Sequence, residues 1–149
     1  FKHIKVVMEG VKGMSDVAIN SNYDDYIFSV KANFINVEVL NEAITKVSKS
    51  LDYLYVPPIE GESFTNKNGK FIRGFDYPID TDEFNNLPGF VQFALESAKV
   101  TSIYRFSKSI KEFSNEKAFV SPSGKSIKLE TSISDLGRGK GTMANEIGF

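Results

Sequence analysis

The sequence predicts an α+β fold, with an antiparallel or mixed sheet of about five or six strands and two main helices on one face. Three observations lead to this prediction. Several short segments alternate apolar and polar residues, which is typical of half-buried strands, whereas two longer segments repeat apolar residues at helical spacing. Asn-Gly and Ser-Gly pairs also separate alternating segments in the manner of hairpin turns.

Size and composition predict one globular domain, residues 1–149, because the chain has 149 residues, of which 41% are hydrophobic and 25% charged. Gly137, Gly139 and Gly141 give the backbone unusual freedom near the end of the chain. We therefore expect residues 137–149 to be a candidate flexible tail.

The first third predicts three strands and a helix. Residues 3–9 alternate in character and are expected to form a strand, residues 17–19 a second short strand, and residues 26–34 the clearest strand after the turn sequence SNYDD. Apolar residues then recur at spacings of three and four, which predicts an amphipathic helix over residues 37–51 with Asn36 as its N-cap. That stripe consists of Val37, Leu40, Ile44, Val47 and Leu51.

The middle of the chain predicts a hairpin and a second helix. Residues 53–56 are a candidate strand that ends at Pro57-Pro58, and Asn68-Gly69 predicts a turn into a returning strand over residues 70–75. Pro88 suits the first turn of a helix. Apolar residues lie almost all round that helix, so we expect it to be deeply buried or lodged against a partner; they are Phe90, Val91, Phe93, Ala94, Leu95 and Ala98.

The last third predicts further strands. Tyr104 and Phe106 alternate with Arg105 and Ser107 in a strand pattern. Residues 118–121 and 127–133 flank a Ser123-Gly124 pair, which predicts a hairpin.

Several chemistries are unfavourable on composition alone. The chain has no cysteine, so thiolate nucleophiles and cysteine-ligated metals are excluded within it, and its one histidine, His3, is poorly placed for a catalytic relay. A net charge of −1 and the lack of RNA-binding aromatic signatures argue against a nucleic-acid partner. No apolar run approaches the roughly 20 residues that cross a bilayer.

The glycine-rich stretch DLGRGKGTM, residues 135–143, fails as a nucleotide loop. A phosphate loop would need glycine where Ser134 stands and serine or threonine where Gly141 stands, and a dinucleotide fingerprint would need glycine where Thr142 stands. We expect a surface loop there. The stretch DTDEF resembles the start of a calcium loop only weakly, because Phe84 and Asn85 occupy positions that need other residues.

Charge is distributed unevenly along the chain. Residues 52–96 carry eight acidic against three basic residues, and residues 99–128 carry seven basic against two acidic ones. The basic segment predicts a face for an anionic partner. The candidate binding residues are therefore the basic Arg105, Lys108, Lys111 and Lys128, together with Phe90 and Phe93 for an apolar ligand. No residue is assigned to catalysis or to a metal, and no cofactor is expected.

Residues 103–136 and 28–47 together resemble small bacterial cell-envelope lipoproteins of uncharacterised function, over about a third of the chain. The matching elements are Tyr104, Phe106, Ile110-Lys111, Ser114-Asn115, Ala118 and the turn from Ser121 to Lys125. The resemblance implies a location in the bacterial envelope, membrane-anchored, periplasmic or surface-exposed. It also implies a lipidated cysteine and a linker before Phe1, so that membrane association would depend on an anchor outside this sequence.

These observations favour a non-catalytic ectodomain of an envelope lipoprotein that binds an apolar or anionic envelope ligand or a protein partner. Two alternatives remain open. One is a hydrolase that uses carboxylates of the acidic central segment, for example Glu62 with Asp76, which would need two converging acids. The other is a structural subunit of an envelope assembly, which would show a large exposed apolar patch.

Overall fold

The computed structural model describes residues 2–51, 62–74, 76 and 79–149 and confirms the α+β class. The described residues form five helices and nine strands in three sheets. Five pairs of neighbouring strands are antiparallel: β1 with β2, β4 with β9, β5 with β8, β6 with β9, and β7 with β8. The prediction of one sheet with two helices on one face is therefore wrong in its detail. The chain divides into two compact units, Phe1–Thr65 and Asn66–Phe149, where the composition predicted one domain.

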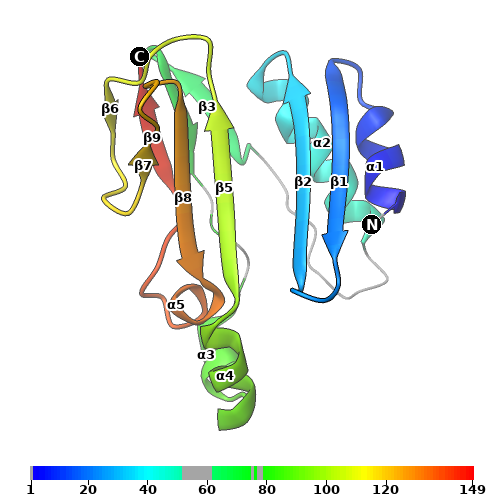
Figure 1. The fold of residues 1–149 in the computed structure, drawn as a ribbon, viewed down its shortest axis with the longest axis vertical. Coiled ribbons are helices and arrows are strands. Elements are labelled where there is room, and N and C mark those ends of the chain that lie inside the picture. Colours follow the sequence, from blue (N-terminus) through cyan, green and yellow to red (C-terminus); the bar gives the residue numbers. More distant parts are fainter. Residues whose placement is uncertain (1, 52–61, 75, 77–78) are drawn as a thin grey trace. The chain divides into compact units, whose positions relative to one another are not determined.

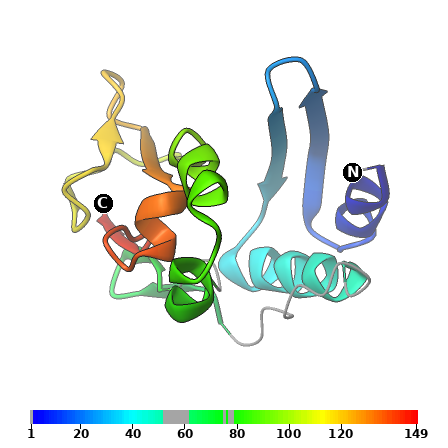
Figure 2. The same ribbon diagram turned by 90° about the horizontal axis from the view of Figure 1, so that it is seen from below.

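Unit 1 is a two-stranded hairpin with two helices (Figures 1 and 2). Its elements are α1 (Lys2–Glu9), β1 (Met14–Asn22), β2 (Ile27–Phe34) and α2 (Val37–Ser50). Both helices contact β1, and they contact each other. A small core of Val11, Val39 and Ala43, with Met14 and Phe34 packed against it, joins the helices to the hairpin.

The first segment is a helix, so the strand predicted over residues 3–9 is wrong. Ile4, Val7 and Met8 are half-buried, which is a helical spacing of three and four, whereas Val6 is 67% exposed. The apolar run fits both periods, and packing of α1 against α2 and β1 selects the helix. In contrast, α2 begins as predicted, because the side chain of Asn36 accepts a hydrogen bond from the backbone N–H of Val39 at 3.0 Å.

Unit 2 contains two sheets and three helices (Figure 1). Its strands are β3 (Phe64–Lys67, which crosses the unit boundary), β4 (Lys70–Arg73), β5 (Lys99–Arg105), β6 (Glu112–Phe113), β7 (Phe119–Val120), β8 (Ser126–Ser132) and β9 (Asn145–Gly148). Its helices are α3 (Thr81–Asn85), α4 (Gly89–Glu96) and α5 (Ile133–Gly137). One sheet has the order β3-β4-β9-β6 and the other the order β5-β8-β7.

Both hairpins predicted in unit 2 are confirmed. Asn68 and Gly69 have φ angles of 53° and 76° between β3 and β4, and Gly124 has a φ of 68° between β7 and β8. At Asn68 and Gly69, positive φ at both central residues matches the twist of β3 and β4. The predicted strand over residues 53–56, Pro57-Pro58 and the end of the predicted strand at Phe75 lie outside the described residues.

Aromatic rings join the two sheets of unit 2. The Phe71 ring on β4 lies 5.1 Å from the ring of Tyr104 and 5.3 Å from the ring of Phe106, measured between centroids, and Phe106 lies 4.7 Å from Phe149. Arg73 on β4 donates from Nη1 to the Ser102 hydroxyl at 2.8 Å. The inner faces of the sheets are therefore in direct contact.

The C-terminal segment is part of this core. Strand β9 lies between β4 and β6, and both Met143 and Ile147 are 0% exposed. Residues 137–149, for which the glycines suggested a flexible tail, thus supply an interior strand and two fully buried side chains. An interior strand needs only a few apolar residues, so neighbouring glycines make its sequence pattern hard to recognise.

Candidate functional site

The outer surface of the β5-β8-β7 sheet gathers the basic and apolar residues of the last third of the chain. Side chains alternate across a strand, so Lys99, Thr101, Ile103 and Arg105 of β5 all point outward and are exposed. We call this surface the cationic face; it consists of Lys99, Thr101, Ile103, Arg105, Phe119, Lys128 and Glu130.

Its centre is a row across three strands. Lys128 of β8 lies opposite Ile103 of β5 on one side and opposite Phe119 of β7 on the other. Ile103 is 47% exposed and Phe119 is 66% exposed. The aliphatic stem of the lysine therefore lies between two apolar side chains while its ammonium group reaches outward.

One carboxylate organises the charges of this face. Glu130 accepts a hydrogen bond from Lys99 Nζ at 3.0 Å and one from Thr101 Oγ1 at 3.2 Å, and it forms an ion pair with Lys128 Nζ at 2.9 Å. These interactions, that with Lys128 foremost, lower the pKa of Glu130 to about 2. With Lys99, Arg105 and Lys128 against one carboxylate, the cationic face keeps an excess of positive charge.

The structure places two of the six predicted site residues on the cationic face. Arg105 and Lys128 lie on the cationic face, and Lys108 and Lys111 are exposed on the loop that follows β5. No ion pair joins Arg105, Lys108 or Lys111 to an acid among the residues that the structure describes. Backbone hydrogen bonds from Phe106 to the Lys125 carbonyl and from Ile110 to the Gly124 carbonyl hold the loop.

The other two predicted residues, Phe90 and Phe93, form a separate surface on α4. They are 77% and 75% exposed, so deep burial of this helix within the chain is wrong, and the alternative that it lodges against a partner stays a prediction. Helix α4 precedes the first residue of β5, while Arg105 is the last, and seven residues of strand span about 20 Å. The phenylalanines and the cations therefore do not form one site.

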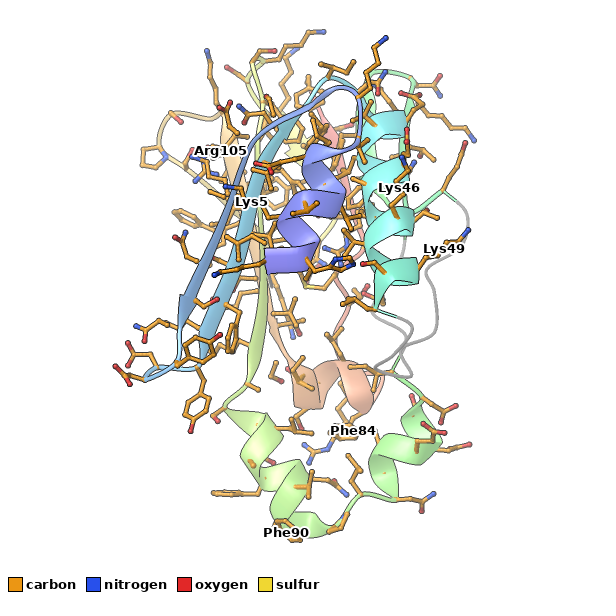
Figure 3. All side chains as sticks on the ribbon, turned by 90° about the vertical axis from the view of Figure 1, so that its right-hand side faces the viewer. Lys5, Lys46, Lys49, Phe84, Phe90 and Arg105 are labelled. Carbon is orange, nitrogen blue, oxygen red and sulfur yellow. The ribbon has the colours of Figure 1, made fainter. Side chains whose placement is uncertain are left out.

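Another phenylalanine, Phe84, is buried between α3 and α5. Phe84 on α3 is 3% exposed, and Figure 3 shows it between the helices, with Phe90 at their outer end. A Cβ atom at Gly137 would lie 2.3 Å from the Phe84 ring. Only glycine therefore fits at position 137, because any side chain there would collide with the Phe84 ring. This contact explains one of the glycines of the stretch DLGRGKGTM.

The acidic residues of the middle segment have structural partners. Asp80 is the N-cap of α3 and accepts a hydrogen bond from the Glu83 N–H at 2.9 Å. Asp76 accepts hydrogen bonds from the Thr142 hydroxyl, at 2.7 Å, and from the Met143 N–H. Within the described ranges, no three acidic or histidine side chains gather as a metal site would need.

The two described carboxyl groups with a resolved pKa shift, Glu112 and Glu130, are both shifted downward. The pKa of Glu112 is lowered by its hydrogen bond and ion pair with Lys70, and the pKa of Lys70 is raised by the same contacts. A general acid needs the opposite shift, towards neutrality. Both groups lie outside the acidic central segment, residues 52–96, so the hydrolase alternative stays a prediction.

Ile103 and Phe119 are absent from the residues that the sequence singled out. Only the strand register places them beside Lys128. Comparison with known proteins adds nothing further: no protein family, curated protein or solved structure matches this chain. None of the helices in the described residues is long and apolar enough to cross a membrane.

Proposed function

We propose that this chain is a non-catalytic binding module of the bacterial cell envelope, and that its cationic face binds the anionic headgroups of lipids. The observation that carries the proposal is the exposed row Ile103, Lys128 and Phe119 beside Arg105. It combines positive charge with apolar side chains on one sheet surface.

This combination suits the interface of an anionic bilayer better than it suits a purely polar ligand. Arg105 offers a planar set of donors that matches a phosphate group, and it has no competing acid among the described residues. Lys108 and Lys111, exposed on the loop that follows β5, add positive charge near Arg105 in the sequence. The Phe119 ring can enter the boundary between headgroups and acyl chains, where aromatic side chains are favoured.

Vesicle sedimentation tests this proposal. The whole chain should bind vesicles of phosphatidylglycerol and phosphatidylcholine, and it should bind vesicles of phosphatidylcholine alone much less. Replacing Arg105, Lys108 and Lys111 by glutamine should weaken binding by roughly fivefold for each charge removed. Added salt should weaken the binding of the wild-type chain, because screening shortens the range of its charges.

A matched control uses three exposed lysines of unit 1. The variant Lys12→Gln/Lys31→Gln/Lys49→Gln loses the same total charge and should keep wild-type binding. If both triple variants lost vesicle binding equally, the net charge of the chain alone would explain the effect. That result would contradict the proposal that the cationic face is the binding surface. Binding that ignores phosphatidylglycerol would overturn the proposal altogether.

A further inference from the structure

Unit 2 also contains a pocket of about 540 Å³ that the cationic face does not include. It lies where the ends of β4 and β9 meet the loop after β6 and the glycine-rich stretch. None of the described residues that line it is aromatic. Its polar and charged lining residues are Arg73, Ser114, Asn115, Glu116, Lys117, Lys140, Thr142, Asn145 and Glu146.

Asn145 is the best-defined donor of this pocket. The residue is 4% exposed, and its Oδ1 accepts hydrogen bonds from the backbone N–H groups of Ser114 and Asn115 at 3.1 and 3.0 Å. Backbone N–H groups can only donate, so these contacts fix which side-chain atom is the oxygen. No described residue forms a hydrogen bond with the Nδ2 of Asn145. This nitrogen is also not one of the fully buried side-chain atoms without a partner, so it keeps some accessible surface.

Three cations line the same pocket as this amide. Arg73 lies directly opposite Asn145 in the ladder between β4 and β9 and lines the same pocket. Lys140 makes no ion pair with any acid in the part of the chain that the structure describes, and Lys117 reaches Asp135 only at 3.8 Å. Of the two acids in the lining, Glu146 lies 3.8 Å from Lys70. The described lining thus holds three cations and two acids, Glu116 and Glu146, beside the Asn145 amide. Arg73 directs its Nη1 to Ser102 and Tyr104.

We infer that this pocket binds the oxyanion, a phosphate or a carboxylate, of a small polar molecule, with Asn145 and Lys140 as direct donors. The amide hydrogens of Asn145 can only donate, and an accessible donor that has no partner among the described residues is open to an acceptor ligand. Lys140 supplies the charge that a neutral amide lacks. This site is independent of the cationic face, which none of its lining residues helps to form.

Nuclear magnetic resonance titration of the whole chain with inorganic phosphate, and separately with acetate, tests the inference. The side-chain amide of Asn145 and the backbone amides of Gly141 and Thr142 should shift with a saturable dependence on concentration. Saturation with phosphate alone identifies a phosphate site, and saturation with acetate alone identifies a carboxylate site. No saturable shift at Asn145 with either anion would overturn the inference.

Asn145→Asp is the sharpest variant, because a carboxylate still accepts both backbone hydrogen bonds but presents negative charge to the pocket. It should weaken anion binding by at least about tenfold. Lys140→Gln should weaken anion binding by roughly twofold to fivefold. Lys140 is exposed, so this substitution should leave the folded structure intact. Wild-type affinity in Lys140→Gln, or in a folded Asn145→Asp, would contradict the assignment.

Lys108→Gln is the matched control, because Lys108 is an exposed lysine that does not line the pocket. It should leave phosphate affinity unchanged, whereas Lys140→Gln should leave vesicle binding unchanged. The two proposals can therefore fail separately. A loss of phosphate affinity in Lys108→Gln equal to that in Lys140→Gln would place the anion outside the pocket and contradict the inference.

Discussion

Glu130 shows how one residue can set the chemistry of a surface. A carboxylate on a strand of a basic sheet would normally reduce its attraction for anions. Here the carboxylate holds Lys99 and Lys128 in place while Arg105 keeps its charge available. The result is an ordered positive surface, since lysine side chains without a partner sample many rotamers.

Glu130 should titrate far below an ordinary glutamate. Its pKa is lowered from 4.5 to about 2, so a ¹³C titration of its side-chain carboxyl should show a midpoint near the lower value. Lys128→Gln should move that midpoint upward, because it removes the largest cause of the shift. A wild-type midpoint near 4.5 would show that these contacts do not persist in solution.

The sign of the stability effect follows from the direction of this shift. A carboxyl group with a lowered pKa in the folded state stabilises the fold fully above its unfolded pKa and loses that contribution as the pH falls through the folded one. The wild-type chain should therefore exceed Glu130→Gln in stability above about pH 4.5, and the difference should disappear as the pH approaches about 2.

Residues with local signals were predictable. Asn36 caps α2 through its own side chain, and Asn68-Gly69 makes a turn by its own backbone preference, so a few neighbouring letters are enough. Asn145 was not predictable, because its hydrogen-bond partners are 30 and 31 residues away in sequence. The same holds for Lys128, whose apolar neighbours come from two other strands.

Among the elements, α3 and α4 carry phenylalanines with opposite roles. Phe84 on α3 is 3% exposed and packs against Gly137, whereas Phe90 and Phe93 on α4 are mostly exposed. All three lie within ten residues of sequence, and residue type alone gives no reason to separate them. Only the placement of α5 decides which ring is covered.

Substitutions should separate these roles. Phe84→Ala should lower the free energy of unfolding by about 3–5 kcal/mol, because it removes a buried ring and leaves a cavity. Phe90→Ser should change that free energy by no more than about 0.5 kcal/mol, since an exposed side chain loses little burial. Urea denaturation of both variants checks this, and equal effects would contradict the described packing of the two helices.

The elements that the sequence failed to predict share a cause. The strand β9 has four residues, and its partners β4 and β6 are distant in the chain. Segment α1 contains apolar residues that fit strand and helix alike. In each case tertiary packing decides between states that local pattern leaves nearly equal in free energy.

At the scale of the whole chain, the fold class could be predicted but the division into two units could not. Alternating segments and hairpin turns are local, so α+β followed from them. The six candidate site residues were chosen by type, and the topology then placed Arg105 and Lys128 on one sheet surface and both phenylalanines on α4. Composition could supply the candidates, while only strand order could sort them into surfaces.

The most direct test of the cationic face uses the fact that the chain contains no cysteine. A single cysteine introduced at Phe119, Phe90 or Tyr26, all of which are exposed, can carry an environment-sensitive fluorophore without side reactions. On phosphatidylglycerol vesicles, the emission of the label at position 119 should shift to the blue, and the labels at positions 90 and 26 should remain unchanged. A blue shift at position 90 or 26 with none at 119 would contradict the assignment of the cationic face as the lipid-binding surface.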